Sequence, residues 1–305
     1  MNMDIKHFGE FNLIKRLTKG IKTDKSVVVG IGDDAAVLEY SKKEYLLLTC
    51  DMLVENVHFL RKTMPEDVGW KSVCCSISDI AAMGGEPKWL AVSIGLPKNL
   101  KLEYIDGIYK GIKKTALRFN VSIVGGDTVS SEKVVIDVAM IGSVKKKNLV
   151  LRSGAKLGDA IFVMGSLGNA VKTGKHLRFT PRLKESQVLV NNFKINSMMD
   201  ISDGLSADLG HILEMSKAGA IIYEKYIPKA RGASLESALS EGEDFELLFT
   251  VSKKEASRIM KIFPRMSKTR LTFIGEIIKP AFGLVMIDKD KKLVQVKPKG
   301  FNHFA

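Results

Sequence analysis

The 305-residue chain has little cysteine, few aromatic residues and no long apolar run. Its three cysteines, Cys50, Cys74 and Cys75, have no C-x-x-C spacing, which excludes a small disulfide scaffold and predicts a reducing, cytoplasmic location. No segment approaches the ~18 uninterrupted apolar residues of a membrane span. Residues 1–17 mix acids with bases where a secretory signal would be apolar. With 45% hydrophobic and 27% charged residues, the composition predicts a soluble globular protein.

Negative charge is the minority: 34 Asp and Glu stand against 47 Lys and Arg, a formal net charge of +13. Nucleic-acid binding would predict a concentrated basic stripe with interleaved aromatic residues. The lysines are scattered instead, and aromatic residues make up 7% of the chain. We interpret the surplus as solubilising surface charge, with attraction of an anionic small molecule as a secondary role. Neither a nucleic acid nor a membrane is expected as a partner.

The pattern of apolar runs predicts two α+β domains, residues 1–148 and 149–305, each with a mixed sheet packed with helices. Strands are predicted in the first half at 26–30, 45–49, 89–97, 121–124 and 134–144. Helical spacing covers 65–83 and 102–119. In the second half strands are predicted at 160–164, 219–223, 246–251, 272–277 and 283–287, with a helix that opens near Asp200. The alternation is too irregular for a doubly wound parallel sheet.

Two familiar phosphate-binding motifs are incomplete in this chain. Residues 168–176 approach a Walker A loop, but the glycines are one residue too far apart and His176 replaces the Mg²⁺-binding hydroxyl. We predict a helix end or loop there. The G-I-G run at 30–32 follows a strand as a dinucleotide fingerprint would, yet Asp33 and Asp34 come next. Two carboxylates repel a bare pyrophosphate and attract one that already carries Mg²⁺.

Acidic residues recur beside glycines or at the predicted ends of apolar strands. Nine acids occupy such settings: Asp33, Asp34, Asp51, Asp79, Asp127, Asp200, Asp203, Glu243 and Asp244. Asp200 and Asp203, three residues apart at an expected helix start, are predicted to share one helix face. Mg²⁺ takes oxygen ligands, commonly one or two carboxylates per ion together with water and substrate phosphate. Several ions on one triphosphate therefore need several such acids.

Each acid also has a purely structural interpretation. Asp33 and Asp34 could form an Asx turn, Asp200 or Asp203 could cap a helix, and Asp127 could belong to turn chemistry after two glycines. For any single acid the structural interpretation is the stronger one. Taken together, the repeated pattern favours a site for metal-bound phosphate.

Histidine and cysteine supply no catalytic arrangement of their own. His58, seven residues beyond Asp51, could line the same site, whereas the other four histidines have no mutual metal-ligand spacing. No Ser-His-Asp or Cys-His arrangement can be argued from spacing, and no general base is found. Cys74 and Cys75 are predicted to be small core residues.

Ten motifs, in order along the chain, resemble those of the thiamine-monophosphate kinase family in the aminoimidazole ribonucleotide synthetase-like superfamily. They are GEFNLI (9–14), GIGDDAAVL (30–38), residues 51–59, SDIAAMGGEP (78–87), GGDT (125–128), RSGAKLGD (152–159), TPR (180–182), DISDGLSADLGHI (200–212), GEDFEL (242–247) and KGFNHFA (299–305). The resemblance implies ATP-dependent phosphorylation of thiamine monophosphate to thiamine diphosphate, the last step of thiamine diphosphate biosynthesis. It also implies direct in-line transfer with several Mg²⁺ ions, and a cytoplasmic homodimer paired through the N-terminal domains.

The same resemblance implies residue roles, with no residue acting as a general base. The implied metal ligands are Asp34, Thr49, Asp51, Asp79, Asp127, Asp200 and Asp203. The implied ATP contacts are Tyr109, Gly126, Arg152 and Ser202, and the implied substrate contacts are His58, Glu243 and Phe301. Residues 1–148 would bind ATP and Mg²⁺ and form the dimer, and residues 149–305 would complete the nucleotide and substrate site.

The chain departs from the family pattern at a few positions. Cys50 stands where the family usually has Thr or Ser, Met52 replaces a common Thr, and Ser76 stands where Asn is frequent. The segment 165–182 is shorter than in many relatives. None of these departures removes a carboxylate, so the resemblance implies an intact activity.

Several rival functions remain to be weighed against this one. A selenophosphate synthetase would carry an N-terminal Cys or selenocysteine, which residues 1–25 lack, and a hydrogenase-maturation dehydratase would end on a reactive Cys, where this sequence has Phe304-Ala305. Aminoimidazole ribonucleotide synthetase shares the fold, but the KGFNHF motif and His58 favour the thiamine enzyme. A non-catalytic nucleotide-binding protein is the alternative from another class, and the complete set of acids argues against it.

Overall fold

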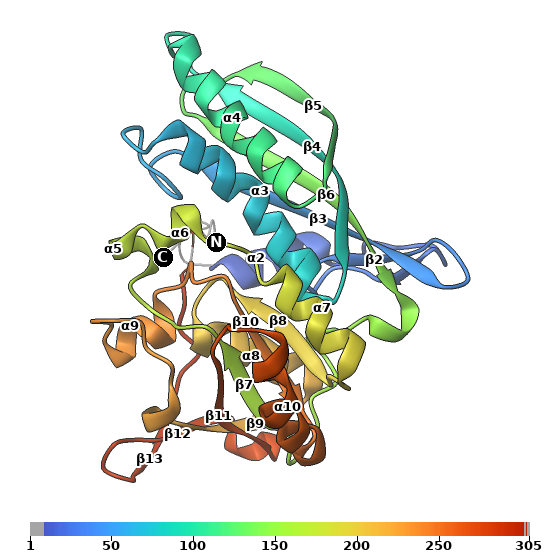
Figure 1. Ribbon diagram of the computed structural model, residues 1–305, viewed down its shortest axis with the longest axis vertical. Helices are drawn as coiled ribbons and strands as arrows, with labels where there is room; N and C mark the ends of the chain where they lie inside the picture. The colour runs from blue at the N-terminus through green and yellow to red at the C-terminus, as the bar shows by residue number, and fades with distance from the viewer. Residues whose placement is uncertain (1–8, 302, 304–305) are drawn as a thin grey trace, which may run out of the picture.

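Two mixed β-sheets, each packed with helices, make up the protein (Figure 1). The structure is a computed structural model that describes residues 9–301 and 303. All strands of the first sheet come from residues 27–145 and all strands of the second from residues 160–295. The chain therefore completes one sheet before it begins the other, and the predicted α+β class is confirmed.

The first sheet has six strands in the order β1-β2-β3-β6-β4-β5. They are β1 (Val27–Val29), β2 (Ala36–Glu39), β3 (Glu44–Val54), β4 (Glu86–Leu96), β5 (Ser122–Ser130) and β6 (Val135–Lys145). Strands β4 and β5 are parallel, and the other neighbours are antiparallel. The short helix α2 (Glu10–Thr18) precedes β1, and a 3-10 turn, η1 (Lys146–Asn148), follows β6. Helices α3 (Pro65–Ala82) and α4 (Leu102–Arg118) cover one face of this sheet (Figure 1).

The second sheet has seven strands in the order β13-β12-β9-β11-β7-β10-β8. They are β7 (Ala160–Met164), β8 (Ser197–Ile201), β9 (Gly219–Tyr223), β10 (Glu246–Val251), β11 (Leu271–Ile278), β12 (Leu284–Ile287) and β13 (Leu293–Gln295). Its helices are α5 (Ala170–Thr173), α6 (Lys175–Arg178), α7 (Leu183–Asn192), α8 (Leu205–Ser216), α9 (Leu235–Ser240) and α10 (Lys253–Met266), with 3-10 turns η2 (Glu224–Tyr226) and η3 (Pro280–Phe282). Strands β9 and β12 are parallel, and the other neighbouring pairs are antiparallel.

Strand β3 shows why the first sheet has one covered face and one open face. Leu47 and Thr49 are buried toward the helices, whereas Leu48 and Met52 are 40% and 56% exposed. This alternation follows from the period of two along a pleated strand. The strand also runs five residues beyond the predicted 45–49, so Asp51 lies inside it and not after it.

The prediction of a helix near Asp200 is wrong. Residues 197–201 form β8, in which Asp200 pairs with Leu247 of β10, and α8 begins only at Leu205. All five residues of β8 are buried, so the run lacks the alternation that marks a strand in sequence. Asp200 and Asp203 consequently do not share a helix face. The predicted helix end or loop at 168–176 contains the one-turn helix α5 and the start of α6.

Helix α3 is buried on nearly all sides because it lies between the first sheet and the second domain. It contacts β3 and β6 on one side and α6, α7 and β8 on the other. The fixed φ of Pro65 suits the first turn of the helix. Past its end, the amides of Gly84 and Gly85 donate to carbonyls of the last turn. Side chains on α3 can therefore reach residues of both domains.

Three clusters of buried apolar side chains stabilise this arrangement. The first lies between the first sheet and its helices, and it includes Phe179 and Phe245 from the second half of the chain. The other two lie on the two faces of the second sheet, and one of them includes Ala82 from the end of α3. Cys74 and Cys75 belong to the first cluster, which confirms their prediction as core residues.

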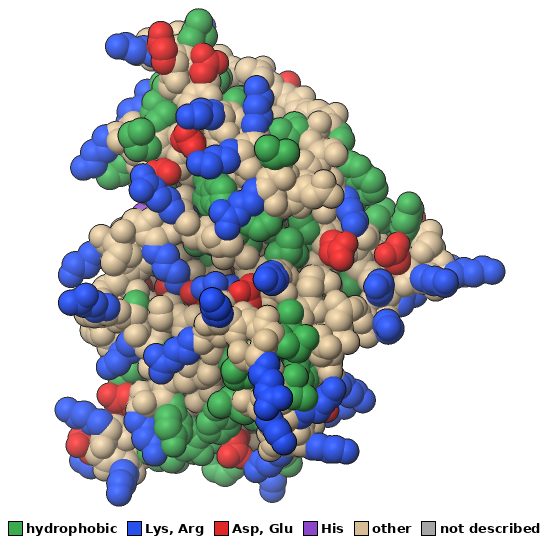
Figure 2. Space-filling model, viewed as in Figure 1, with side chains coloured by type: hydrophobic (Ala, Val, Ile, Leu, Met, Phe, Trp, Pro, Cys, Tyr) green, Lys and Arg blue, Asp and Glu red, His purple; other side chains and the backbone are tan. Residues whose placement is uncertain are grey.

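The surface agrees with the interpretation of the positive charge. Figure 2 shows Lys and Arg side chains spread over the whole of the visible face, across both domains, with no single basic stripe. Within residues 9–301 and 303, no helix is both long and apolar enough to cross a membrane.

Candidate active site

Three carboxylates from three different elements meet where the two domains join. Asp34 precedes β2, Asp79 lies on α3 and Asp200 lies on β8, and one oxygen of each is within 4.8 Å of the others. The Thr49 hydroxyl on β3 donates to Asp79 at 2.5 Å, and Asp51 on the same strand is close enough for its charge to raise the pKa of Asp79. Residues far apart in sequence thus form one acidic group, which we call the carboxylate cluster: Asp34, Asp51, Asp79 and Asp200.

Two serines on α3 orient members of this cluster. The Ser76 hydroxyl donates to Asp51 at 2.6 Å, and the Ser78 hydroxyl donates to Asp200 at 2.6 Å. The two serines are two residues apart, so they reach different neighbours around the helix. Ser76, one of the departures from the family pattern, therefore has a defined role in this chain.

Arg152 neutralises only part of the negative charge. Its Nη2 and Nε donate to Oδ1 of Asp34 at 2.6 and 3.1 Å, and its backbone amide donates to the carboxylate of Asp33. Oδ2 of Asp34 is buried, and no donor in the described part of the chain reaches it. A buried carboxylate oxygen without a partner is unfavourable, and a bound cation would satisfy it. The residues present therefore fit a divalent ion held by oxygen ligands.

Burial of the cluster raises the pKa of its acids. Burial, with the neighbouring charge of Asp34, raises the pKa of Asp200 to about 7. Burial and the charge of Asp34 also raise the pKa of Asp33 to about 7. The pKa of Asp79 lies well above its usual range because of burial first, and then of the charges on Asp51 and Asp200. Without a cation the cluster holds protons that a divalent ion would displace.

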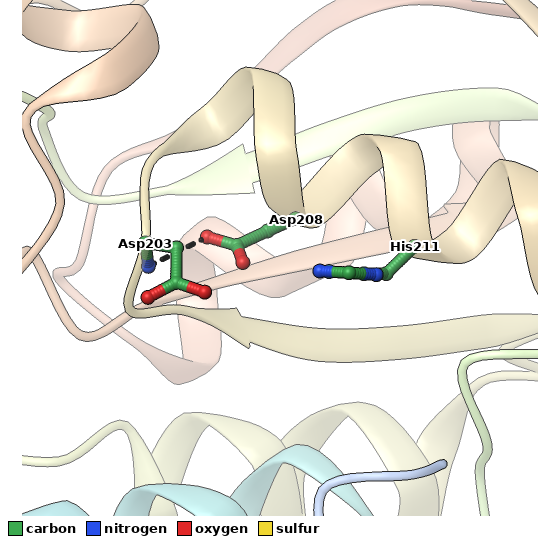
Figure 3. A group of neighbouring side chains, drawn as sticks. All are labelled: Asp203, Asp208 and His211. Atoms are coloured by element: carbon green, nitrogen blue, oxygen red, sulfur yellow. Dashed lines mark hydrogen bonds between the residues drawn. The ribbon is translucent and has the colours of Figure 1, made fainter. Parts of the chain in front are cut away.

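A second acidic group lies just after β8, the strand that carries Asp200 (Figure 3). Asp203 is in the turn after β8, and Asp208 and His211 are three residues apart on α8; their ligand atoms lie within 4.8 Å of one another. Figure 3 shows the three side chains directed toward one another. Oδ2 of Asp208 accepts hydrogen bonds from the amides of Asp203 and Gly204, at 3.2 and 3.0 Å. Burial raises the pKa of Asp203 to about 6.

Asp208 and His211 were not predicted as site residues. The signal was present, because an acid and a histidine three residues apart on a helix lie on one face. Asp203 belongs to this second group, and Asp200 belongs to the carboxylate cluster. The two predicted ligands are thus close in sequence but have different neighbours.

The three predicted substrate residues lie along one wall of the site. The ring of His58 lies 5.1 Å from that of His303, and the ring of His303 lies 4.8 Å from that of Phe301. The amide of Phe301 donates to the carbonyl of Asp203 at 3.0 Å, which ties this wall to the second acidic group. Asn302, Phe304 and Ala305 of the predicted terminal motif lie outside the described residues.

His58 is neutral in this setting. Burial and the positive charge of Lys71 lower the pKa of His58 to about 4. Its Nδ1 accepts a hydrogen bond from the amide of Val54 at 2.9 Å, so the proton of the neutral ring is on Nε2. The ring can therefore donate one hydrogen bond into the site without a positive charge.

Glu243 reaches the same wall from the second domain. It has φ 62°, a left-handed conformation that is unfavourable for a residue with a side chain, and Phe245 has φ 50°. The amides of Glu243 and Phe245 donate to the carbonyls of Ser202 and Ile201, which holds the loop against the end of β8. Through this contact the loop of Glu243 and the predicted ATP residue Ser202 are held together.

The carboxylate of Glu243 forms an ion pair with Lys71, a residue that the sequence reasoning missed. Lys71 lies on α3 and is fully buried. A lysine inside the otherwise uncharged run VGWKSVCCS was the available signal, since lysine is almost never fully buried without a partner.

Three predicted residues lie away from the carboxylate cluster. Residues directly opposite one another on neighbouring strands lie on the same face of a sheet. Asp127 of β5 is opposite Ser93 of β4, Ser93 is opposite Asp137 of β6, and Asp137 is opposite Met52 of β3. Asp127 therefore lies on the open face with Met52. Thr49 and Asp51 face the opposite way. Asp127 is also inside β5, and not after a strand as predicted.

Gly126 and Tyr109 have structural surroundings of their own. Gly126 lies opposite Val92, where an added Cβ would be 1.9 Å from the Val92 carbonyl oxygen, so the pairing of β5 with β4 requires glycine there. Tyr109, on α4, packs against the first apolar cluster. In the described part of the chain, no hydrogen bond or ion pair joins either residue to the carboxylate cluster.

Comparison with known proteins identifies the class. The family model of the AIR synthase related protein N-terminal domain matches residues 32–144, and that of the C-terminal domain matches residues 147–286. Thiamine-monophosphate kinase of Buchnera aphidicola subsp. Schizaphis graminum is 36% identical over 97% of this chain and 99% of its own length. That of Aquifex aeolicus is 35% identical over 99% of this chain and 100% of its own length.

Structural similarity agrees with these matches. A solved structure of AaThiL complexed with AMPPCP and TMP has a TM-score of 0.86 and 35% sequence identity, and the match covers 99% of each chain. The fold is thus that of an AIR synthase related protein. The chain belongs to this family and, within it, to the thiamine-monophosphate kinases.

Proposed function

We propose that the protein transfers the γ-phosphoryl group of ATP to thiamine monophosphate, giving thiamine diphosphate. The observation that carries the proposal is the carboxylate cluster, in which a buried oxygen of Asp34 lacks a donor beside Arg152. Full-length similarity to thiamine-monophosphate kinases supports the two substrates. The three unpaired cysteines support a cytoplasmic location, where thiamine diphosphate biosynthesis would end with this reaction.

We assign the metal-binding role to the oxygen ligands at the domain junction. They are Asp34, Thr49, Asp51, Asp79 and Asp200, with Asp203 from the neighbouring group and Asp127 from the open face of the sheet. When bound there, several Mg²⁺ ions supply neutralisation and alignment of the phosphate oxygens. The raised pKa of Asp200 and the unpartnered oxygen of Asp34 are the features that fit such ions.

The transfer itself needs positioning more than proton chemistry. A phosphate oxygen of thiamine monophosphate forms a bond to the γ-phosphorus of ATP, and the bond from that phosphorus to the oxygen of ADP breaks. The second pKa of a phosphate monoester is about 6, so the attacking oxygen is already largely deprotonated at neutral pH. This agrees with a site in which no residue is assigned as a general base. Arg152 suits the nucleotide phosphates because its planar group presents paired donors.

The thiamine portion fits the wall formed by His58, Glu243 and Phe301. The neutral His58 ring can donate from Nε2. The Glu243 carboxylate attracts the thiazolium cation or accepts from the aminopyrimidine. Phe301 is 41% exposed, so its ring face is available to stack on a heteroaromatic ring.

Coupled measurement of ADP release tests the function. With Mg²⁺ and ATP we expect release that depends on thiamine monophosphate, and none above background with free thiamine or an aminoimidazole precursor. Turnover of free thiamine but not of its phosphate would overturn the assigned substrate. Binding of nucleotide without turnover of any of the three would favour a nucleotide-binding protein.

We also propose a homodimer that forms through the open face of the first sheet. This face exposes apolar side chains that would normally be covered: Leu48 40%, Met52 56%, Trp89 40% and Val129 55%. All nine residues of β5, including Gly126 and Asp127, are exposed. Several large apolar side chains exposed on one face of a sheet are typical of a protein–protein contact. A second copy would cover β5 and so bring Gly126 and Asp127 into a shared groove.

Charge on that face should break the dimer. We expect wild-type protein to have twice the chain mass of 33.6 kDa in light scattering, and Met52→Lys combined with Val129→Asp to run as a monomer. Leu117→Lys is the matched control, because Leu117 is 84% exposed on α4, away from the open face. A wild-type monomer, or a dimer that survives the double substitution, would contradict the assigned interface.

A further inference from the structure

Lys71 connects the two halves of the substrate wall. It is on α3 of the first domain, and its side chain is fully buried. Its Nζ donates to the backbone carbonyl of His58 at 3.0 Å and to Oε2 of Glu243. One ammonium group therefore binds the loop of His58 in the first domain and the loop of Glu243 in the second. Glu243 is 172 residues from Lys71 in the sequence.

The burial of this ion pair is unequal, and that points to a geometric role. The side chain of Lys71 is 0% exposed, whereas that of Glu243 is 20% exposed. Removing two charges from water is costly, so a buried ion pair is a weak source of stability compared with apolar side chains of the same volume. A well-attested use of such pairs is to specify one arrangement of the groups around them.

The backbone of the Glu243 loop is fixed by other contacts, but the carboxylate is not. Gly242 and Glu243 have φ 73° and 62°, and the Glu243 amide donates to the Ser202 carbonyl at 2.6 Å. Those contacts fix the backbone position of Glu243. The ion pair with Lys71 fixes the position of the carboxylate. Because the ion pair uses Oε2, Oε1 can accept a hydrogen bond from a substrate donor.

His58 is held in a complementary way. Its Nδ1 accepts from the Val54 amide and so fixes the ring, while its carbonyl accepts from Lys71. The single ammonium group of Lys71 thus donates both to the backbone carbonyl of His58 and to the carboxylate of Glu243. The distance between the two substrate contacts follows from this shared donor.

We propose that Lys71 is a positioning residue that sets the spacing of His58 and Glu243 and thereby the affinity of the site for thiamine monophosphate. This inference rests on the proposed function. Lys71 is buried and does not contact the substrate; it acts through its two partners. Its loss should weaken recognition of the thiamine portion and leave recognition of ATP intact, since Arg152 and the carboxylate cluster do not contact Lys71.

The test compares Lys71→Met, Glu243→Gln and the double variant by steady-state kinetics with both substrates varied. Lys71→Met keeps the volume and removes the charge and the donors. We expect it to raise KM for thiamine monophosphate by at least about tenfold, with KM for ATP within about twofold of wild type. Because the two residues act together, the double variant should show little more loss than the worse single variant.

Ser186→Ala is the matched control. The Ser186 hydroxyl donates to the Ala81 carbonyl of α3, so this variant also removes a buried hydrogen bond between α3 and the second domain, but one away from the substrate wall. It should leave both KM values unchanged. An unchanged KM for thiamine monophosphate in Lys71→Met, an equal rise in both KM values, or fully additive losses in the double variant would overturn the proposal.

Lys71→Met can fail to fold, which would show as the loss of a cooperative thermal transition. In that case the double variant is compared with Glu243→Gln, because the double variant replaces both charged residues and leaves no unpaired buried charge. Equal KM values for thiamine monophosphate support action through Glu243, and a further tenfold rise overturns it. Failure of wild-type protein to use thiamine monophosphate would instead refute the proposed function, so the two failures are distinguishable.

Discussion

Asp79→Asn is expected to lower kcat/KM for thiamine monophosphate by a factor on the order of 10³. Asp79 belongs to the carboxylate cluster: it accepts a hydrogen bond from Thr49, and carboxylate oxygens of Asp34 and Asp200 lie within 4.8 Å of its own. An amide of the same shape cannot supply the negative charge that holds cations against the phosphates. Coupled ADP release at saturating Mg²⁺ measures the loss.

The same substitution should have the opposite effect on the stability of the ion-free protein. The charges of Asp51 and Asp200 oppose ionisation of Asp79, so removing this acid relieves repulsion and should keep or raise Tm. The rise in Tm that Mg²⁺ gives to the wild type should be lost. A variant that is stabler and inactive is typical of a residue kept for function.

Asp67→Asn is the control for these measurements. Asp67 lies in the first turn of the same helix and forms an exposed ion pair with Arg178, far along α3 from Asp79. Its loss should change neither turnover nor the response of Tm to Mg²⁺. If Asp79→Asn turned over normally and lowered the Tm of ion-free protein, Asp79 would be a structural acid and the multi-ion site would be wrong.

Much of the fold was predictable because most strands alternate or are flanked by polar residues. The predicted ranges 160–164, 219–223 and 246–251 coincide with β7, β9 and β10. Full burial alone did not prevent prediction, because β7 and β10 are buried along their whole length as well. Prediction failed at β8, where the run SMMDI is short and includes Asp200, so it lacks the continuous apolar and β-branched character that indicates a buried strand. The lengths of β3 and β5 were also underestimated, because these strands continue through Asp51 and Asp127.

The acids of the site were predictable one by one, but their grouping was not. Each of Asp34, Asp79 and Asp200 has a local setting that marks it in sequence. Nothing local shows that Asp200 meets Asp34 while Asp203 pairs with Asp208. Pairing of the strands and packing of α3 between the domains decide this. The ion pair of Lys71 with Glu243 is similar, because its partners come from different domains.

Ion-free protein is expected to lose stability as pH rises from about 4 to 7, and Mg²⁺ is expected to reverse that loss. Asp200 has a folded pKa of about 7 against an ordinary value of 3.8, and Asp203 has one of about 6. A group with a raised folded pKa contributes stability that is present below its unfolded pKa and is lost as pH rises through the folded pKa. For these acids the window of loss is therefore about pH 4 to 7.

Mg²⁺ needs the carboxylates ionised, so its effect must grow across the same window. At a Mg²⁺ concentration 100-fold above its Kd, linkage gives about 2.7 kcal/mol. For a chain of this size that corresponds to a rise in Tm of about 5 °C. We expect this rise at pH 8 and almost none at pH 5, where protons occupy the cluster.

Thermal melts with Mg²⁺ and with EDTA at the two pH values check this. Comparison with Asp200→Asn separates the contribution of this site to the pH dependence of Tm from that of the other titratable groups. The variant should lose less stability than wild type between pH 5 and 8 in EDTA, because the group whose ionisation is opposed by burial is gone. It should also gain less from Mg²⁺ at pH 8. An equal gain from Mg²⁺ at both pH values would mean that the ions bind at carboxylates with ordinary pKa values, and the buried cluster would then not be the metal site.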